Sequence, residues 1–172
     1  IQASAKTLLA LVEDVLDISA IEVGKLKCVE SDFRLTDILD GIRTMLQPVA
    51  QGKGILFGIE VGREVPASLH GDGDHLRQIL VNLISNAIKF TERGSVAVTV
   101  DCTRMEADTG VATLMFSVRD TGIGIPEAAQ QRIFQASEQA DAGHGRRFGG
   151  TGLGTTIAKS LTDLRGGRIG FE

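Results

Sequence analysis

The sequence predicts an α+β domain, an α/β sandwich in which helices lie on one face of a mixed β-sheet and a separate helix precedes them. Three segments carry their apolar residues on one helical face, namely 36–51, 74–90 and 155–164. Segments such as 95–103 and 111–119 alternate apolar and polar residues, as half-buried strands do. Elements that are apolar on one side only favour two layers packed around one core.

Length and composition narrow the classes of function that the chain can have. The 172 residues, 42% of them hydrophobic, suffice for one full domain and an extra element. A net charge of −4, no basic run and no Trp or Tyr give no reason to expect nucleic-acid binding. Cys28 and Cys102 fit neither a zinc motif nor a disulfide framework, which favours a reducing, cytoplasmic setting. No apolar run approaches the roughly 20 residues that cross a bilayer, so we expect no direct membrane contact.

The first segment is expected to be a bundle-type helix. Its apolar residues are spaced by 3, 4 and 3 positions, at Leu8, Leu11, Val15 and Ile18. One helix cannot bury this stripe alone, which favours a partner helix over packing on its own domain. We therefore predict a helix in residues 1–24, a polar linker, and the main domain in residues 25–172.

The next elements follow from caps and alternation. Thr36 is the expected N-cap of the helix ending near Gln51, with Pro48 in its last turn or at a kink. Asp72 or Asp74 is the expected N-cap of the central helix. The segment 28–35 before the first of these helices is expected to be extended. The expected strands are 55–61, 68–71, and the antiparallel hairpin 95–103 with 111–119.

The central helix carries an unusual polar stripe. Gln78, Asn82 and Asn86 fall at i, i+4 and i+8, and Lys89 continues the same stripe. Asn is a mediocre helix former, and a solvated helix face normally carries Glu and Lys. Amide oxygens suit Mg²⁺ and an ammonium group suits phosphate. From the helix alone, ligand binding and a solvated face both stay open.

Two glycine-rich segments follow. Asp120 stands at the end of a strand with Gly122 and Gly124 behind it, so a backbone can approach a flat ligand while Asp120 accepts from an amino group. A helix is expected from Pro126 to Phe134. Six of the twelve residues in 143–154 are Gly, and this loop leads into a helix N-terminus, which is a phosphate site or else a loop of no function. Gly166 and Gly167 then turn the chain into an expected strand, 168–171.

In this order the motifs resemble the catalytic ATP-binding domain of sensor histidine kinases, especially the hybrid type. Gln78-x-x-x-Asn82-Leu-x-x-Asn86-Ala-x-Lys89-Phe-Thr is similar to the family's N box, and Asp120-Thr-Gly-Ile-Gly to its G1 box. Ile133-Phe134 and Gly150-Thr-Gly-Leu-Gly154 are similar to the F and G2 boxes, and residues 1–24 to the end of the dimerisation helix. The resemblance covers almost the whole chain and implies the Bergerat ATP-binding fold, shared with topoisomerase, 90 kDa chaperone and mismatch-repair ATPases.

The resemblance also implies roles for matching residues. Asn82 is expected to bind Mg²⁺ and, with Lys89, to be catalytic, while Asp120 is expected to accept from the adenine amino group. The residues implied in ATP binding are Asn82, Asn86, Lys89, Asp120, Gly122, Gly124, Phe134, Arg146, Arg147, Gly150, Thr151, Gly152, Leu153 and Gly154. The implied partners are ATP or ADP, a response-regulator receiver domain, and a second copy of the parent protein through the first helix. The parent is expected in the cytoplasm or anchored in a bacterial inner membrane.

Departures from the family pattern leave alternatives open. None of His70, His75 and His144 has the context of a phosphoacceptor, so this stretch is not expected to autophosphorylate. Thr155 and Thr156 stand where Leu and Ala are more usual, and the final strand of the family is missing, so a sheet edge is expected to be open. The alternatives are an ATPase of the same superfamily, which Gln78 disfavours because an amide cannot act as a general base, and a nucleotide-binding pseudokinase.

Overall fold

The computed structural model describes residues 28–130, 133–134 and 153–172. The chain divides into two compact units, Val29–Gly124 and a second unit that joins Ile1–Cys28 to Ile125–Glu172. The helix predicted in residues 1–24 and the domain boundary after it lie outside the described residues. No helix in the described ranges has the length and apolar character needed to cross a membrane.

The first unit contains a mixed sheet, as the sequence predicts. Its elements in chain order are β1 (Ser31–Arg34), α2 (Leu35–Gly52), β2 (Ile55–Val61), β3 (Ser68–Gly71), α3 (Gly73–Phe90), β4 (Gly94–Met105) and β5 (Ala112–Asp120). The three-stranded sheet has the order β2-β4-β5, with β2 parallel and β5 antiparallel to β4. Strands β1 and β3 form a separate antiparallel pair.

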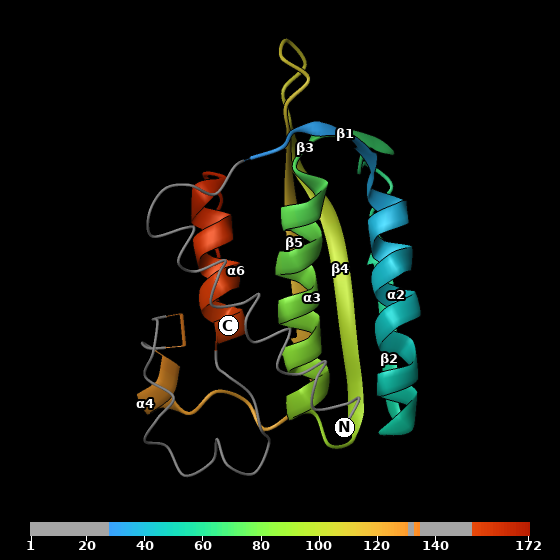
Figure 1. Ribbon diagram of the computed structural model, residues 1–172, viewed down its shortest axis with the longest axis vertical. Helices are drawn as coiled ribbons and strands as arrows, with labels where there is room; N and C mark the ends of the chain where they lie inside the picture. Colours follow the sequence, from blue (N-terminus) through green and yellow to red (C-terminus); the bar gives the residue numbers. More distant parts are fainter. Residues whose placement is uncertain (1–27, 131–132, 135–152) are drawn as a thin grey trace. The chain divides into compact units, whose positions relative to one another are not determined.

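Helices α2 and α3 lie side by side on one face of this sheet (Figure 1). The apolar stripe of α2 and the apolar face of α3 meet alternate residues of β4, which is the arrangement that one-sided periodicity predicts. The largest fully buried side chains of this core are Leu35, Ile42, Leu80, Ile84, Ile88, Val96, Val98 and Val100. The two-layer fold class is therefore confirmed for this unit.

The start of α2 differs from the prediction. The helix begins at Leu35, not after Thr36, and Arg34 takes the N-cap position without a side-chain hydrogen bond. Leu35 is only 1% exposed, so its burial draws the chain into the first turn two residues early. Pro48 lies inside the helix, which continues to Gly52.

Asp72 caps α3, as predicted. Its Oδ1 accepts a hydrogen bond from the His75 backbone N–H at 2.9 Å, and its Oδ2 accepts one from the Val29 N–H at 3.1 Å. The imidazole of His75 also lies 2.9 Å from Oδ2. Asp72 therefore fixes both the first turn of α3 and the chain entering β1.

The hairpin β4–β5 positions the end of β5 beside α3. Its antiparallel register pairs Val96 with Asp120, and a bulge lies between Cys102 and Arg104. Only residues 91–93 separate α3 from β4. Because β4 starts directly after α3 and β5 runs back along it, Asp120 arrives near the C-terminal end of α3.

The second unit has two helices among its described residues. Helix α4 (Glu127–Gln130) is shorter than the predicted helix 126–134, of which 131–132 lie outside the described residues and 133–134 form a turn. Helix α6 (Leu153–Leu164) starts two residues earlier than predicted. Gly166 turns the chain at a φ of 68° as expected. The predicted strand 168–171 is wrong, because these residues pair with no described strand and an extended ladder requires a partner.

Candidate functional site

The polar stripe of α3 is not a solvated face. Gln78, Asn82, Asn86 and Lys89 are all half-buried. The Asn82 Nδ2 atom is fully buried and has no hydrogen-bond partner among the described residues. An unpaired buried amide costs about 1–3 kcal/mol, so a site that holds one is usually explained by a missing ligand or water.

The chemistry of this amide fits a nucleotide phosphate with its metal. Nδ2 can donate to a phosphate oxygen, and a half-turn of the amide would offer Oδ1 to Mg²⁺. The described residues contain no group of three or more His, Cys, Asp or Glu that could hold a metal. A magnesium ion here would therefore need phosphate oxygens as its main ligands, as Mg²⁺ does in many nucleotide sites.

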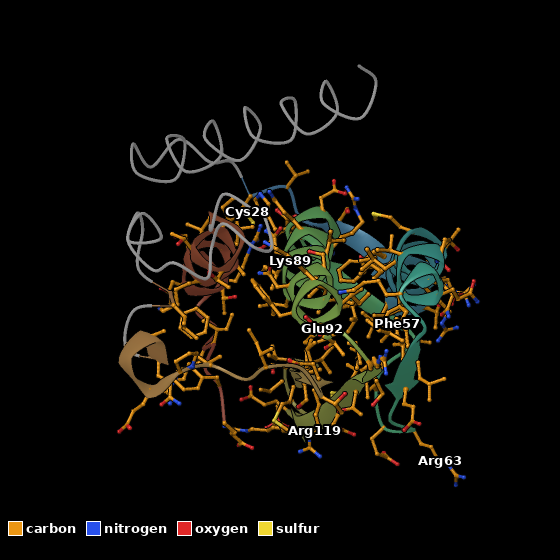
Figure 2. The ribbon with its side chains drawn as sticks, turned by 90° about the horizontal axis from the view of Figure 1, so that it is seen from below. Cys28, Phe57, Arg63, Lys89, Glu92 and Arg119 are labelled. Carbon is orange, nitrogen blue, oxygen red and sulfur yellow. The ribbon has the colours of Figure 1, made fainter. Side chains whose placement is uncertain are left out.

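Lys89 carries a desolvated charge. Burial lowers the pKa of its ammonium group below the usual range of lysine. Its Nζ lies 4.8 Å from the centroid of the Phe90 ring. Figure 2 shows Lys89 at the end of α3 that faces the viewer. Because no acidic side chain of the described residues forms an ion pair with Lys89, an anionic ligand would stabilise it.

Asp120 holds its own loop. Its Oδ1 accepts a hydrogen bond from the Gly122 N–H at 2.8 Å, and Oδ2 has no partner among the described residues. Thr121 fastens the loop to β4, because its Oγ1 accepts from the Ser95 N–H at 3.0 Å and its N–H donates to the Ser95 carbonyl at 3.1 Å. One carboxylate oxygen thus remains for a ligand while the other shapes the turn.

Gly122 brings the loop against α3. A Cβ at this position would lie 2.5 Å from the carbonyl oxygen of Phe90 and 2.8 Å from Asp120 Oδ1. The next residue, Ile123, donates its N–H to the same Phe90 carbonyl at 3.4 Å. Gly124 has a φ of 68°, which favours glycine for a different reason. The two predicted motifs, one on α3 and one after β5, therefore meet at the last residue of α3.

The other predicted site residues belong to the second unit or lie outside the described residues. Phe134 belongs to the second unit, where its ring centroid lies 6.3 Å from that of Phe171. Leu153 and Gly154 open helix α6 in the same unit, and Thr156 in its first turn is buried. The predicted phosphate-loop residues Arg146, Arg147, Gly150, Thr151 and Gly152 lie outside the described residues.

Sequence reasoning missed two residues that hold this site together. Thr121 was part of the glycine motif, but its hydroxyl had no assigned role. Lys53 gave no signal, because a lysine between glycines in a turn is normally solvated. In the structure its Nζ donates to the carbonyls of Ile88 and Lys89, at 2.6 Å and 2.9 Å.

Comparison with known proteins agrees with this geometry. The family described as "Histidine kinase-, DNA gyrase B-, and HSP90-like ATPase" matches residues 71–172. The chain is 51% identical over its full length to the sensory/regulatory protein RpfC of Xanthomonas campestris pv. campestris, and covers 24% of that protein. It is 44% identical over its full length to the signal transduction histidine-protein kinase BarA of Escherichia coli strain K12, and covers 18% of it.

Solved structures also resemble the chain. Full-length ShkA in complex with AMPPNP superposes with a TM-score of 0.77 and 34% identity, covering 95% of this chain and 32% of that one. The histidine kinase AdeS of Acinetobacter baumannii has a TM-score of 0.70 at 17% identity, covering 94% of this chain and 70% of that one, which shows the fold alone. This chain thus spans about a quarter or less of the length of the curated relatives above.

Proposed function

The chain belongs to the family of histidine kinase-, DNA gyrase B- and HSP90-like ATPases, and from that membership we propose that it is the catalytic ATP-binding domain of a sensor histidine kinase. In this role it binds ATP with Mg²⁺ and presents the γ-phosphate to a phosphoacceptor histidine other than His70, His75 and His144. Relatives described as histidine kinases match the chain over its full length, which supports the proposal.

The observation that carries the proposal is the unpaired Nδ2 of Asn82. It lies buried on the helix whose last residue contacts the Asp120 loop through Phe90. A nucleotide with its metal supplies what these residues lack, namely a phosphate-bound Mg²⁺ for the turned amide of Asn82, phosphate oxygens for Lys89, and an amino group for Oδ2 of Asp120. No other single ligand class provides both kinds of group so directly.

Each residue has a defined task in this proposal. Asp120 orients the adenine, Gly122 and Gly124 line it, and Asn86 and Lys89 face the phosphates. Asn82 would hold Mg²⁺, which would supply charge neutralisation for the phosphates. Phosphoryl transfer requires mainly positioning and electrostatic stabilisation, so these groups suffice to present ATP.

Kinase chemistry is favoured over ATP hydrolysis by Gln78. A hydrolase of this family needs a base to activate water, and the amide of Gln78 cannot accept a proton at neutral pH.

The full protein is proposed to be a cytoplasmic or membrane-anchored homodimer. Residues 1–24 would contribute to the dimer interface, and the receiver domain of a response regulator would accept the phosphoryl group.

Calorimetric titration with ATP and ADP, with and without Mg²⁺, tests the site. Asp120→Asn loses the charge of the acceptor and should weaken ATP and ADP alike, by about one to two decades, whether or not metal is present. Asn82→Ala should hardly change binding without metal, yet remove most of the gain that Mg²⁺ brings. Asp108→Asn, at the exposed tip of the β4–β5 hairpin, is the matched control and should bind as the wild type does.

Both variants should keep their melting temperature, because Asp120→Asn retains an oxygen that can accept from the Gly122 N–H, and Asn82→Ala removes an Nδ2 that has no partner among the described residues. Equal, metal-independent losses in the two variants would contradict the assignment of Asn82 to the metal. A wild-type chain that binds no adenine nucleotide would contradict the proposed function itself.

A further inference from the structure

We propose that Lys53 is a positioning residue for nucleotide binding, which acts by fixing the C-terminal end of α3 against the Asp120–Gly124 loop. This inference rests on the proposed function, since it names a residue that supports the same site. Lys53 belongs to neither motif and directly follows α2. It lies 35 and 36 positions before its two acceptors in the sequence, but contacts both of them in the fold.

The evidence is that each of the last four backbone carbonyls of α3 accepts a hydrogen bond. The last four carbonyls of a helix have no partner within the helix and need one elsewhere. Here the Ala87 carbonyl accepts from the N–H and the hydroxyl of Thr91, at 3.1 Å and 2.8 Å. The Ile88 and Lys89 carbonyls accept from Lys53 Nζ, at 2.6 Å and 2.9 Å.

The fourth carbonyl, that of Phe90, accepts from the Ile123 N–H of the glycine loop at 3.4 Å. Three groups from different parts of the chain therefore hold this one helix end. Thr91 is local and Ile123 belongs to the loop, so Lys53 is the group that fixes the end from the side of α2. Its positive charge also suits the negative end of the helix dipole.

Lys53 is itself held in place, which a positioning residue requires. Its backbone N–H donates to the Ala50 carbonyl at 3.1 Å, and the Gly54 N–H donates to the Gln51 carbonyl at 2.9 Å. Gly54 has a φ of 69° and turns the chain directly into β2. The lysine stem thus starts from the fixed junction between α2 and β2.

Loss of Lys53 would affect the candidate site through the last turn of α3. Lys89 extends from this turn, and the Phe90 carbonyl oxygen is the atom that a Cβ added at Gly122 would approach most closely. Without Lys53, two carbonyls lose a charged donor and must turn toward water, which frays the turn that places both groups. Nucleotide affinity should fall although Lys53 does not touch the nucleotide.

The test compares Lys53→Met, Lys53→Arg and Arg63→Met by ADP titration and amide NMR spectra of the whole chain. Arg63→Met is the matched control, since it removes the same charge from a side chain that Figure 2 shows pointing away from α2 and α3. Lys53→Met should weaken ADP about ten-fold and shift the amide signals of Gly122 and Ile123. Lys53→Arg keeps the donors and should recover most of the affinity.

An unchanged ADP affinity in Lys53→Met, or an equal loss in Arg63→Met, would overturn the inference. A lowered melting temperature with full ADP affinity would also overturn it, because Lys53 would then be merely structural. The wild-type titration separates this inference from the proposed function. A wild type that binds ADP supports the proposed function whatever the Lys53 variants do.

Discussion

Substitution of Gly122 by alanine tests whether the glycine loop must approach α3 closely. The new Cβ would lie 2.5 Å from the Phe90 carbonyl oxygen, whereas ordinary contact begins at 3.4 Å. The loop or the helix end must therefore move by about 0.9 Å, since the obstacle is backbone and cannot rotate away. The Cβ would also lie 2.8 Å from Asp120 Oδ1, the acceptor that shapes the turn.

The magnitude follows from the two hydrogen bonds at risk. A shift of this size breaks the bond from Ile123 to Phe90, which is already 3.4 Å long, and strains the 2.8 Å bond from Gly122 to Asp120. Each is worth about 1 kcal/mol. We expect Gly122→Ala to lower the free energy of unfolding by about 1–3 kcal/mol, and to weaken ADP at least about ten-fold, because Asp120 is displaced.

Two other glycines serve as controls measured by the same calorimetry and thermal melts. Gly124 has a φ of 68° but no heavy atom within 4 Å of its added Cβ, so Gly124→Ala should cost about 1 kcal/mol of backbone strain with little displacement of Asp120. Gly58 in β2 has neither constraint, so Gly58→Ala should be neutral or slightly stabilising. Wild-type affinity in Gly122→Ala, or equal losses in all three variants, would refute the reasoning.

Two further predictions concern the ends of α3. Burial lowers the pKa of Lys89 in the free protein, and a bound phosphate would favour its charged form, so ADP affinity should fall as pH rises through this lowered pKa. Titrations from about pH 7 to about pH 10 should show this fall, and Lys89→Arg, which stays charged there, should flatten it; a flat wild-type profile would contradict the role of Lys89. Asp72→Ala should lower the free energy of unfolding by about 2 kcal/mol, since it removes both an N-cap and the acceptor of the Val29 N–H, whereas Asp72→Asn should cost about half as much. Thermal melts of both variants are the measurement, and equal losses would indicate that capping is not the cause.

Local sequence patterns predicted most helices and strands of the first unit, because residues close together in the sequence determine these elements. The one-sided periodicity of α2 and α3 and the alternation of β4 and β5 each report which side of an element is buried. The N-cap of α3 was predictable because Asp72 directly precedes the helix and its carboxylate reaches a backbone N–H three residues on. The spans of β2 and β3 agree with the prediction for the same reason, since Gly and Pro punctuate them.

The wrong or missed predictions concern positions whose structure depends on contacts with residues distant in the sequence. Thr36 is a better capping residue than Arg34, yet the burial of Leu35 starts the helix earlier. Residues 168–171 alternate as a strand does, but alternation does not supply a partner strand. Lys53 could not be identified at all, because its two acceptors lie 35 and 36 positions away in the sequence. Such contacts leave no periodic trace in the sequence.

The predicted site residues on α3 share one physical property, namely that the fold leaves their polar groups unsatisfied. Local rules of stability are broken at two positions that lie about two turns apart on this helix. Asn82 buries an unpaired donor, and Lys89 carries a charge whose pKa burial lowers. The opposite end of the helix obeys those rules, with Asp72 fully engaged as a cap. A helix that is optimised at one end and costly along its polar stripe is what ligand binding requires, because groups satisfied within the fold would have nothing left to offer a nucleotide.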